Sequence, residues 1–287
     1  MTRRFVADSP ADRAPAGAAA DPLAAALAAR YGRVHGDAPA APADPLVDRR
    51  RPVRVVVPDG YEDGYAYPVV VWLHDTGATE ATVTATLAGM SDRNYLGLAV
   101  RGAACPGAGG SGFGWSDDAV EDLAARLPGL MTALAAEWHV HPDRVFLAGA
   151  GAGADAAAAL AALKPDWFAG VSLLGGGTLP PDLPPCEFAE YPDPAEEWAA
   201  YAGEPGGLGG GDEEMIDAFD RPPVAGLRVL IAAGAGRREA PAALAAAAAW
   251  RACGANPEVR LAPGDPLSAD ALRAVDAWLM AGLGVGV

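Results

Sequence analysis

The chain has 287 residues, a formal net charge of -16 and a hydrophobic content of 51%, enough apolar material for one large α/β domain or two small ones. The acidic balance argues against a nucleic-acid partner, because recognition of a phosphate backbone needs clustered Lys and Arg. The single basic run, at residues 49–51, is interpreted as a solvated segment before a strand.

The three cysteines, Cys105, Cys186 and Cys253, have no metal-type spacing and cannot all pair with one another. This pattern is typical of a reducing compartment, so we expect a cytoplasmic protein without a metal or a cofactor. Residues 1–20 lack the apolar segment of a signal peptide, and no run of about 18 apolar residues is free of charges and turn residues. We therefore expect no membrane partner.

The first 47 residues are predicted to be a largely disordered extension, in which 1–22 are of low complexity, 23–31 could form one short helix and a Pro/Ala linker follows. A single domain is predicted over 48–284. Its first elements are strands at 53–57 and 68–74, a helix at 79–90 and a strand at 95–100. The apolar residues of the second strand run without interruption, which is typical of parallel strands covered on both faces.

The rest of the domain continues the alternation. After a glycine-rich loop at 101–115 we expect a helix at 117–138, a strand at 145–148, a helix at 152–163 and a strand at 168–174. A segment at about 179–225, rich in Pro, Gly and acidic residues, is predicted to be a lid-like insertion. A strand at 227–233, a helix at 240–252, a strand at 258–261 and a helix at 268–283 complete the pattern. Strands that alternate with helices predict a doubly wound, mainly parallel sheet with helices on both faces.

The central feature is the glycine turn at 149–153, which lies between the predicted strand at 145–148 and the alanine-rich helix that follows. Strand, sharp turn and helix form the layout of the nucleophile elbow, G-x-S-x-G. In this register Gly151 stands where the serine would be. The turn is present without a reactive side chain.

Four segments together resemble the α/β-hydrolase superfamily, in particular small bacterial esterases and phospholipase/carboxylesterases. Residues 67–74 are similar to the strand that leads into the oxyanion motif, and 141–149 to the approach to the elbow. Residues 229–234 are similar to the strand before the triad acid, and 263–279 to the histidine loop and last helix. The resemblance covers about 52–283 and implies the α/β-hydrolase fold and esterase chemistry.

The resemblance also implies a triad in the chain order Ser, acid, His, and none of its three positions matches. The nucleophile position is Gly151, the acid position is Arg237, and the base position is Asp265 or Pro266. No histidine follows the elbow, so Glu239, a neighbouring acid, would have no base to orient. Loss of the nucleophile alone costs a serine hydrolase about a millionfold in turnover. We therefore expect a protein that does not hydrolyse esters.

The oxyanion apparatus is predicted to be partly retained. His74, Asp75, Thr76 and Gly77 occupy the oxyanion-loop position, and the amide of Ala152 follows the vacant nucleophile position. Amides at a helix N-terminus attract anions whatever the side chains are. The hypothesis is a site for a small acyl or anionic ligand or for a protein partner, and the alternative is that these amides are simply solvated.

Other interpretations stay open. An active carboxylic-ester hydrolase would need a relocated nucleophile such as Cys105 or Ser116, although Ser116 is expected to cap the helix at 117–138. Residues 149–154 also fit the dinucleotide pattern G-x-G-x-x-G/A, but the next strand ends without an acid for a ribose.

The side chains of three aspartates and four aromatic residues are expected to have no catalytic role. Asp75, Asp155 and Asp265 are expected to be solvated acids rather than one carboxylate cluster. Aromatic residues are expected to pack in the core or the lid, although they could line a ligand pocket: Trp115, Tyr191, Trp198 and Tyr201.

Overall fold

A computed structural model of the chain describes residues 51–106, 111–177 and 224–283, together with Ala26 and Leu46. The predicted N-terminal extension and its short helix lie outside the described residues, apart from these two positions. The predicted insertion at 179–225 also lies outside them, apart from its last two residues.

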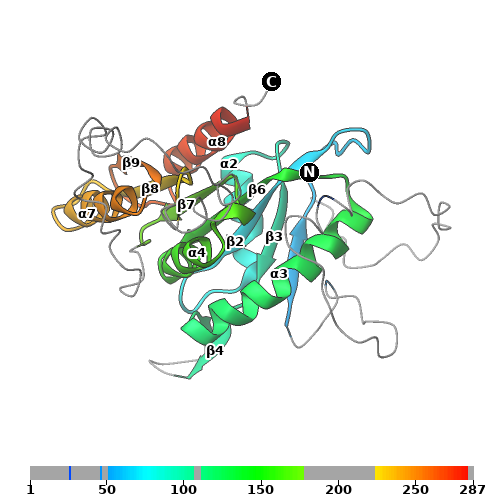
Figure 1. Ribbon diagram of the computed structural model, residues 1–287, viewed down its shortest axis with the longest axis horizontal. Helices are drawn as coiled ribbons and strands as arrows, with labels where there is room; N and C mark the ends of the chain where they lie inside the picture. The colour runs from blue at the N-terminus through cyan, green and yellow to red at the C-terminus, as the bar shows by residue number, and fades with distance from the viewer. Residues whose placement is uncertain (1–25, 27–45, 47–50, 107–110, 178–223, 284–287) are drawn as a thin grey trace, which may run out of the picture.

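The described residues form strands and helices in alternation (Figure 1). The strands are β1 (Val53–Val56), β2 (Tyr67–Leu73), β3 (Leu96–Val100), β4 (Ala103–Pro106), β5 (Ser111–Gly114), β6 (Val140–Ala150), β7 (Gly170–Leu174), β8 (Arg228–Gly234) and β9 (Asn256–Ala262). The helices are α2 (Val83–Met90), α3 (Asp117–Glu137), α4 (Ala152–Leu163), α7 (Glu239–Ala252) and α8 (Ala269–Leu283), with 3₁₀ turns at Glu80–Thr82 and Pro165–Trp167.

One seven-stranded sheet has the order β1-β3-β2-β6-β7-β8-β9. β1 runs antiparallel to β3, and every other pairing in this sheet is parallel. β6, the strand that precedes the glycine turn, is the fourth of the seven. The predicted mainly parallel, doubly wound sheet is confirmed.

Two apolar layers cover the sheet, one on each face. Side chains of α3, α4 and α7 belong to one core cluster, whereas α2 and α8 contribute to a second. Figure 1 shows α3 and α4 on the near side of the sheet. β2, β3 and β7 are buried along their whole length, which explains why their sequences are uninterrupted apolar runs rather than alternating ones.

The structure departs from the sequence prediction in the glycine-rich segment. Residues predicted as a loop at 101–115 contain a two-stranded antiparallel sheet, β4 paired with β5. Its glycines give no alternation of apolar and polar residues, so periodicity could not reveal it. β6 is also longer than the predicted 145–148, because its first residue, Val140, already pairs with Tyr67 before the register shifts.

The parallel strands place their carboxyl ends at one edge of the sheet, where binding sites of doubly wound folds usually lie. The loops after β2, β6, β7, β8 and β9 meet at this edge. In the part of the chain that the structure describes, no helix is both long and apolar enough to cross a bilayer.

Candidate functional site

The glycine turn has a backbone that other residues rarely adopt. Gly151 has φ +52° and ψ -122°, and its amide donates to the carbonyl of Leu174 at the end of β7 (2.9 Å). A positive φ strains any residue with a side chain. α4 begins at the next residue, Ala152, so the sharp strand-to-helix turn of an elbow is present.

The flanking glycines are required by close backbone packing. A Cβ on Gly153 would lie 2.7 Å from the carbonyl carbon of Leu73 and nearer still to two backbone oxygens of β2 and the residue after it. A Cβ on Gly149 would likewise press on the first turn of α4, 2.8 Å from the nitrogen of Ala154. Backbone packing therefore accounts for the repeated glycines without a nucleotide.

The carboxylate of Asp75 fills the space beside Gly151. Its Oδ1 accepts hydrogen bonds from the amides of Thr76 (2.7 Å) and Ala152 (3.0 Å). A Cβ built on Gly151 would collide with all three carboxylate atoms of Asp75, the farthest of them, Oδ2, at 2.6 Å. The two amides expected to hold a ligand's anion thus hold an anion of the chain itself.

His74 holds the loop and is not placed to act as a base. The side chain is fully buried, its Nε2 accepts from the amide of Gly102 (3.0 Å), and its Nδ1 lies 2.8 Å from the carbonyl oxygen of Asp75. Because Nε2 accepts, the proton is assigned to Nδ1 and the ring is neutral. Burial lowers the pKa of the His74 imidazole, which favours this neutral form.

Neighbouring groups fix the loop further. The indole of Trp115 donates to the carbonyl of His74 (2.8 Å), and the amide of Gly77 donates to the carbonyl of Phe113 in β5 (2.8 Å). The amide of Gly77 therefore does not point to the Asp75 carboxylate. Among the five predicted anion-binding residues, Thr76 and Ala152 supply the converging amides.

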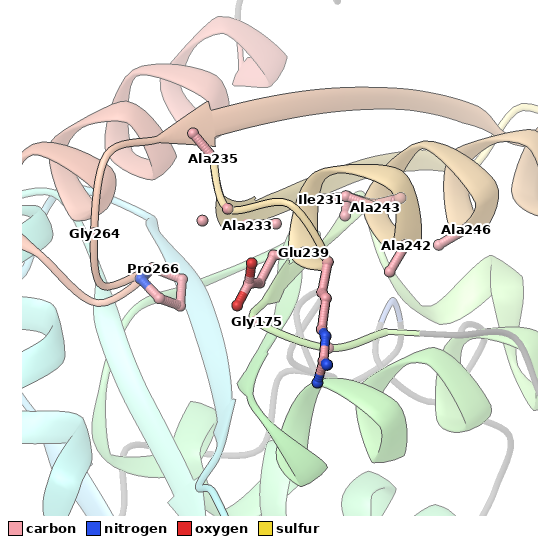
Figure 2. Close-up of a pocket in the computed structure, with 14 residues that line it drawn as sticks. Gly175, Ile231, Ala233, Ala235, Glu239, Ala242, Ala243, Ala246, Gly264 and Pro266 are labelled. Carbon is pink, nitrogen blue, oxygen red and sulfur yellow. The ribbon is translucent and has the colours of Figure 1, made fainter.

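A cavity lies at this edge of the sheet, and neighbours of the predicted triad positions line it: Glu239, the first residue of α7, and Pro266, in the loop after β9. Arg237 is exposed and does not line it, whereas Glu239 does. The carboxylate of Asp265 accepts from the amide of Leu267 (2.8 Å), and Pro266 lines the cavity instead. Figure 2 shows the Glu239 carboxylate and the Pro266 ring directed into the same space.

That cavity has a volume of about 610 Å³ and lies between the carboxyl ends of β7 and β8 and the first turns of α7. Gly176 connects it to the elbow, because a Cβ on Gly176 would lie 2.5 Å from the carbonyl oxygen of Gly151. Its walls are mostly apolar, with Arg238 and Glu239 as the charged members. The lining residues are Gly175, Gly176, Ile231, Ala233, Gly234, Ala235, Gly236, Arg238, Glu239, Ala242, Ala243, Ala246, Gly264 and Pro266.

The remaining predicted residues have local partners. Ser116 accepts from the amide of Ala119 (3.3 Å) and caps α3, while Asp155 accepts from the amide of Gly177 (2.8 Å). The structure describes the backbone of Cys105 in β4 but not its side chain. Tyr191, Trp198 and Tyr201 lie outside the described residues.

The three carboxylates considered as one cluster each accept a hydrogen bond from a different backbone amide. Asp75 accepts at the elbow, Asp155 at the end of β7 and Asp265 in the loop after β9. Within 51–106, 111–177 and 224–283, no three side chains of the metal-binding types gather.

Sequence reasoning missed a partly buried ion pair beside the oxyanion loop. Arg101 donates from Nε and Nη2 to the two carboxylate oxygens of Glu80 (2.6 and 2.7 Å). Burial raises the pKa of Glu80, but the hydrogen bonds and charge of Arg101 outweigh it, so that pKa lies below its usual range. The arginine also lies over the ring of Phe113, at 4.7 Å from the ring centroid, which ties the hairpin to the loop. No spacing in the sequence signals this pair.

Comparisons with known proteins agree with the fold. The model of the Esterase family, described as "Putative esterase", matches residues 45–258. A carboxylesterase of Bacillus cereus is 15% identical with a TM-score of 0.54, covering 83% of this chain and 97% of that one. A carboxylesterase of Mesorhizobium loti is 20% identical with a TM-score of 0.55, covering 82% and 97%.

Comparison with curated proteins gives no match. The solved structures are similar in fold at low sequence identity, and the family model spans most of the chain. The chain therefore belongs to the Esterase family and has the α/β-hydrolase fold.

Proposed function

We propose that this member of the Esterase family is non-hydrolytic and holds a small acyl or anionic ligand, or a protein partner, at the carboxyl edge of the sheet. The observation that supports this most directly is the pair formed by Gly151 and Asp75. The elbow has no side chain that could attack an ester, and a carboxylate occupies the space where that side chain would begin.

The surroundings of the elbow support the same proposal. Nucleophilic catalysis needs a base within hydrogen-bond reach of the nucleophile and a group that orients the base. Pro266 and Glu239 line the cavity where such groups would be expected, and proline cannot accept a proton. Both ring nitrogens of His74 are engaged by the backbone. Ser116, the alternative nucleophile, is engaged in capping α3.

The shape of the cavity favours a small acyl ligand over a protein partner. About 610 Å³ is within the range of small-molecule sites, and alanine, glycine and isoleucine form most of the walls. An uncharged acyl group could lie against α7 without displacing Asp75. An anionic ligand would have to compete with the Asp75 carboxylate for the amides of Thr76 and Ala152.

Two measurements test the proposal. The protein should not accelerate hydrolysis of p-nitrophenyl acetate or butyrate above buffer, and a fluorophosphonate probe should label no residue. Ester turnover that a single substitution at Ser116 or Cys105 abolishes would refute the non-hydrolytic proposal and support the relocated nucleophile.

Binding is tested with ethyl butyrate by isothermal titration, with recovery of the intact ester. Ala242→Leu adds bulk to the cavity wall on α7 and should weaken binding at least severalfold. The matched control is Ala245→Leu, which adds the same bulk to an exposed position of α7 outside the cavity lining. Absence of binding to the wild type, or equal loss in both variants, would contradict ligand binding in this cavity.

A further inference from the structure

The outer edge of the sheet at β9 has a defined set of outward-facing backbone groups. The amide of Asn256 donates to the carbonyl of Leu227, and the carbonyl of Ala262 accepts from the amide of Ala235 (2.8 and 2.9 Å). Both even-numbered ends of β9 therefore face β8. Because peptide groups alternate along a strand, the odd-numbered residues direct their backbone groups to the open edge. Among the described strands, none pairs with that edge.

The outward-facing backbone donors and acceptors of β9 can pair with those of a second β9 that runs in the opposite direction. We propose that β9 pairs antiparallel with β9 of a second copy of this chain, about a two-fold axis at Val259. The two Val259 residues would exchange both backbone hydrogen bonds, and each Leu261 amide would donate to the carbonyl of Pro257 in the other copy. Pro257 has no N–H, so one bond is lost at each end, and four backbone bonds remain. The two strands then continue one sheet through both copies.

On one face of β9 the side chains are charged and complementary in this register. Glu258 and Arg260 pair in register with Leu230 and Ala232, which belong to the core cluster of α2 and α8. Within one chain they form an ion pair of 2.7 Å, with 40% of the Arg260 and 47% of the Glu258 side chain exposed. The two-fold axis places Glu258 opposite Arg260 of the second copy, which gives four alternating charges. Opposite charges directly across an antiparallel pair are stabilising, and like charges are not.

On the other face the opposed side chains are apolar. Val259 packs against the core cluster of α3, α4 and α7, and Leu261 is 43% exposed. The register places Val259 opposite its own copy and Leu261 opposite Pro257 of the second copy. An exposed leucine on an edge strand would thereby be covered. The two nearest alternative registers would set Glu258 opposite Glu258, or Arg260 opposite Arg260, so the charges favour the axis at Val259 over both.

The alternative is that Pro257 and the charged pair keep copies apart, since prolines and charges on edge strands commonly have that effect. The two possibilities predict different masses in solution. Size-exclusion chromatography with light scattering on the full chain at about 100 μM, where a micromolar association is largely complete, should give twice the mass of one chain. A single-chain mass at this concentration overturns the proposal.

Charge reversal tests the register. Arg260→Glu sets like charges across the axis and should give monomers, and Glu258→Arg alone should do the same. The double variant Glu258→Arg, Arg260→Glu restores the alternation and should dimerise like the wild type. Val259→Pro removes the central N–H and should give monomers. Circular dichroism checks that each variant is folded, and a dimer that Arg260→Glu and Val259→Pro both leave intact would assign the contact to another surface and refute the proposal.

Discussion

The contact between Gly151 and Asp75 predicts a strong coupling between two positions 76 residues apart in the sequence. The test uses Gly151→Ala, Asp75→Gly and the double variant. A methyl group at 151 must push the Asp75 carboxylate away from the amides of Thr76 and Ala152, because a Cβ there would overlap all three carboxylate atoms. The backbone at 151 also has a positive φ that alanine adopts at a cost.

The magnitudes follow from these two effects. The conformation of residue 151, with a positive φ and a ψ of -122°, costs about 1–2 kcal/mol for a residue with a Cβ. Loss of the two amide bonds to an exposed carboxylate costs about 1–2 kcal/mol in total, since water replaces the lost partners. Gly151→Ala should therefore lower the free energy of unfolding by about 2–4 kcal/mol. Asp75→Gly should lower the free energy of unfolding by the same contribution of the two amide bonds. The extra chain entropy of glycine adds about 0.5–1 kcal/mol to this loss.

The double variant loses the amide bonds only once. Its destabilisation should therefore be smaller than the sum of the single effects by about 1–2 kcal/mol, which is the coupling that a double-mutant cycle isolates. Urea unfolding of the four proteins, followed by far-ultraviolet circular dichroism, measures each term. Asp166→Gly, at an exposed position in the 3₁₀ turn before β7, is the control and should be additive with Gly151→Ala. Additive effects in the 75/151 cycle would show that the Asp75 carboxylate does not occupy the space beside Gly151.

Three further outcomes can be measured. Gly153→Ala should cost about 3 kcal/mol or more in unfolding free energy because its Cβ would meet backbone of β2, whereas Gly129→Ala, in open space within α3, should stabilise by about 0.5–1 kcal/mol; urea unfolding compares the two. Stability should fall as the pH drops below about 6.5, because burial lowers the pKa of His74 and the unfolded chain then binds more protons; His74→Gln should flatten the unfolding free energy in this range. Glu80→Gln should lower the free energy of unfolding by about 1–3 kcal/mol at pH 7, because it weakens the contact with Arg101. The lowered pKa of Glu80 stabilises the fold above about pH 4.3, and this stabilisation is lost at lower pH, so the variant should lose less stability than the wild type on acidification. Thermal melts from pH 3 to 7 would measure both effects.

The parallel sheet could be predicted from the sequence because most of its strands are short, uninterrupted apolar runs. The runs that became β2, β3, β7 and β8 are buried on both faces, and the alanine-rich segment after residue 151 forms α4. The hairpin of β4 and β5 was missed because glycine hides the alternation of a strand. Register, and therefore which residue of a loop faces inward, depends on contacts between distant segments. Glu239 and Pro266 thus line the cavity, whereas Arg237 and Asp265 do not; spacing had placed Arg237 at the acid position and had left Asp265 and Pro266 open for the base.

The sequence could not predict that the Asp75 carboxylate occupies the anion site, and the reason is a different one. Amides at 76 and 152 could be predicted as donors from their places after a strand and at a helix start, but an acceptor for them could equally be water, a ligand or a side chain. Asp75 becomes the acceptor because Gly151 leaves room for its carboxylate, and that is visible only in three dimensions.

This arrangement makes two uses of the same amides mutually exclusive. Oxyanion stabilisation requires the amides of Thr76 and Ala152 to meet negative charge as it develops on a substrate. In this chain they already meet the charge of Asp75, at 2.7 and 3.0 Å. A substrate oxyanion could use them only after the carboxylate had moved away, and a serine at 151 could fit only under the same condition. Restoration of ester hydrolysis should therefore require three changes: removal of the Asp75 side chain, Gly151→Ser and a new base at position 266. A fluorophosphonate should not label the Gly151→Ser variant alone. Labelling of that single variant would show that the Asp75 carboxylate moves away from the amides without being removed.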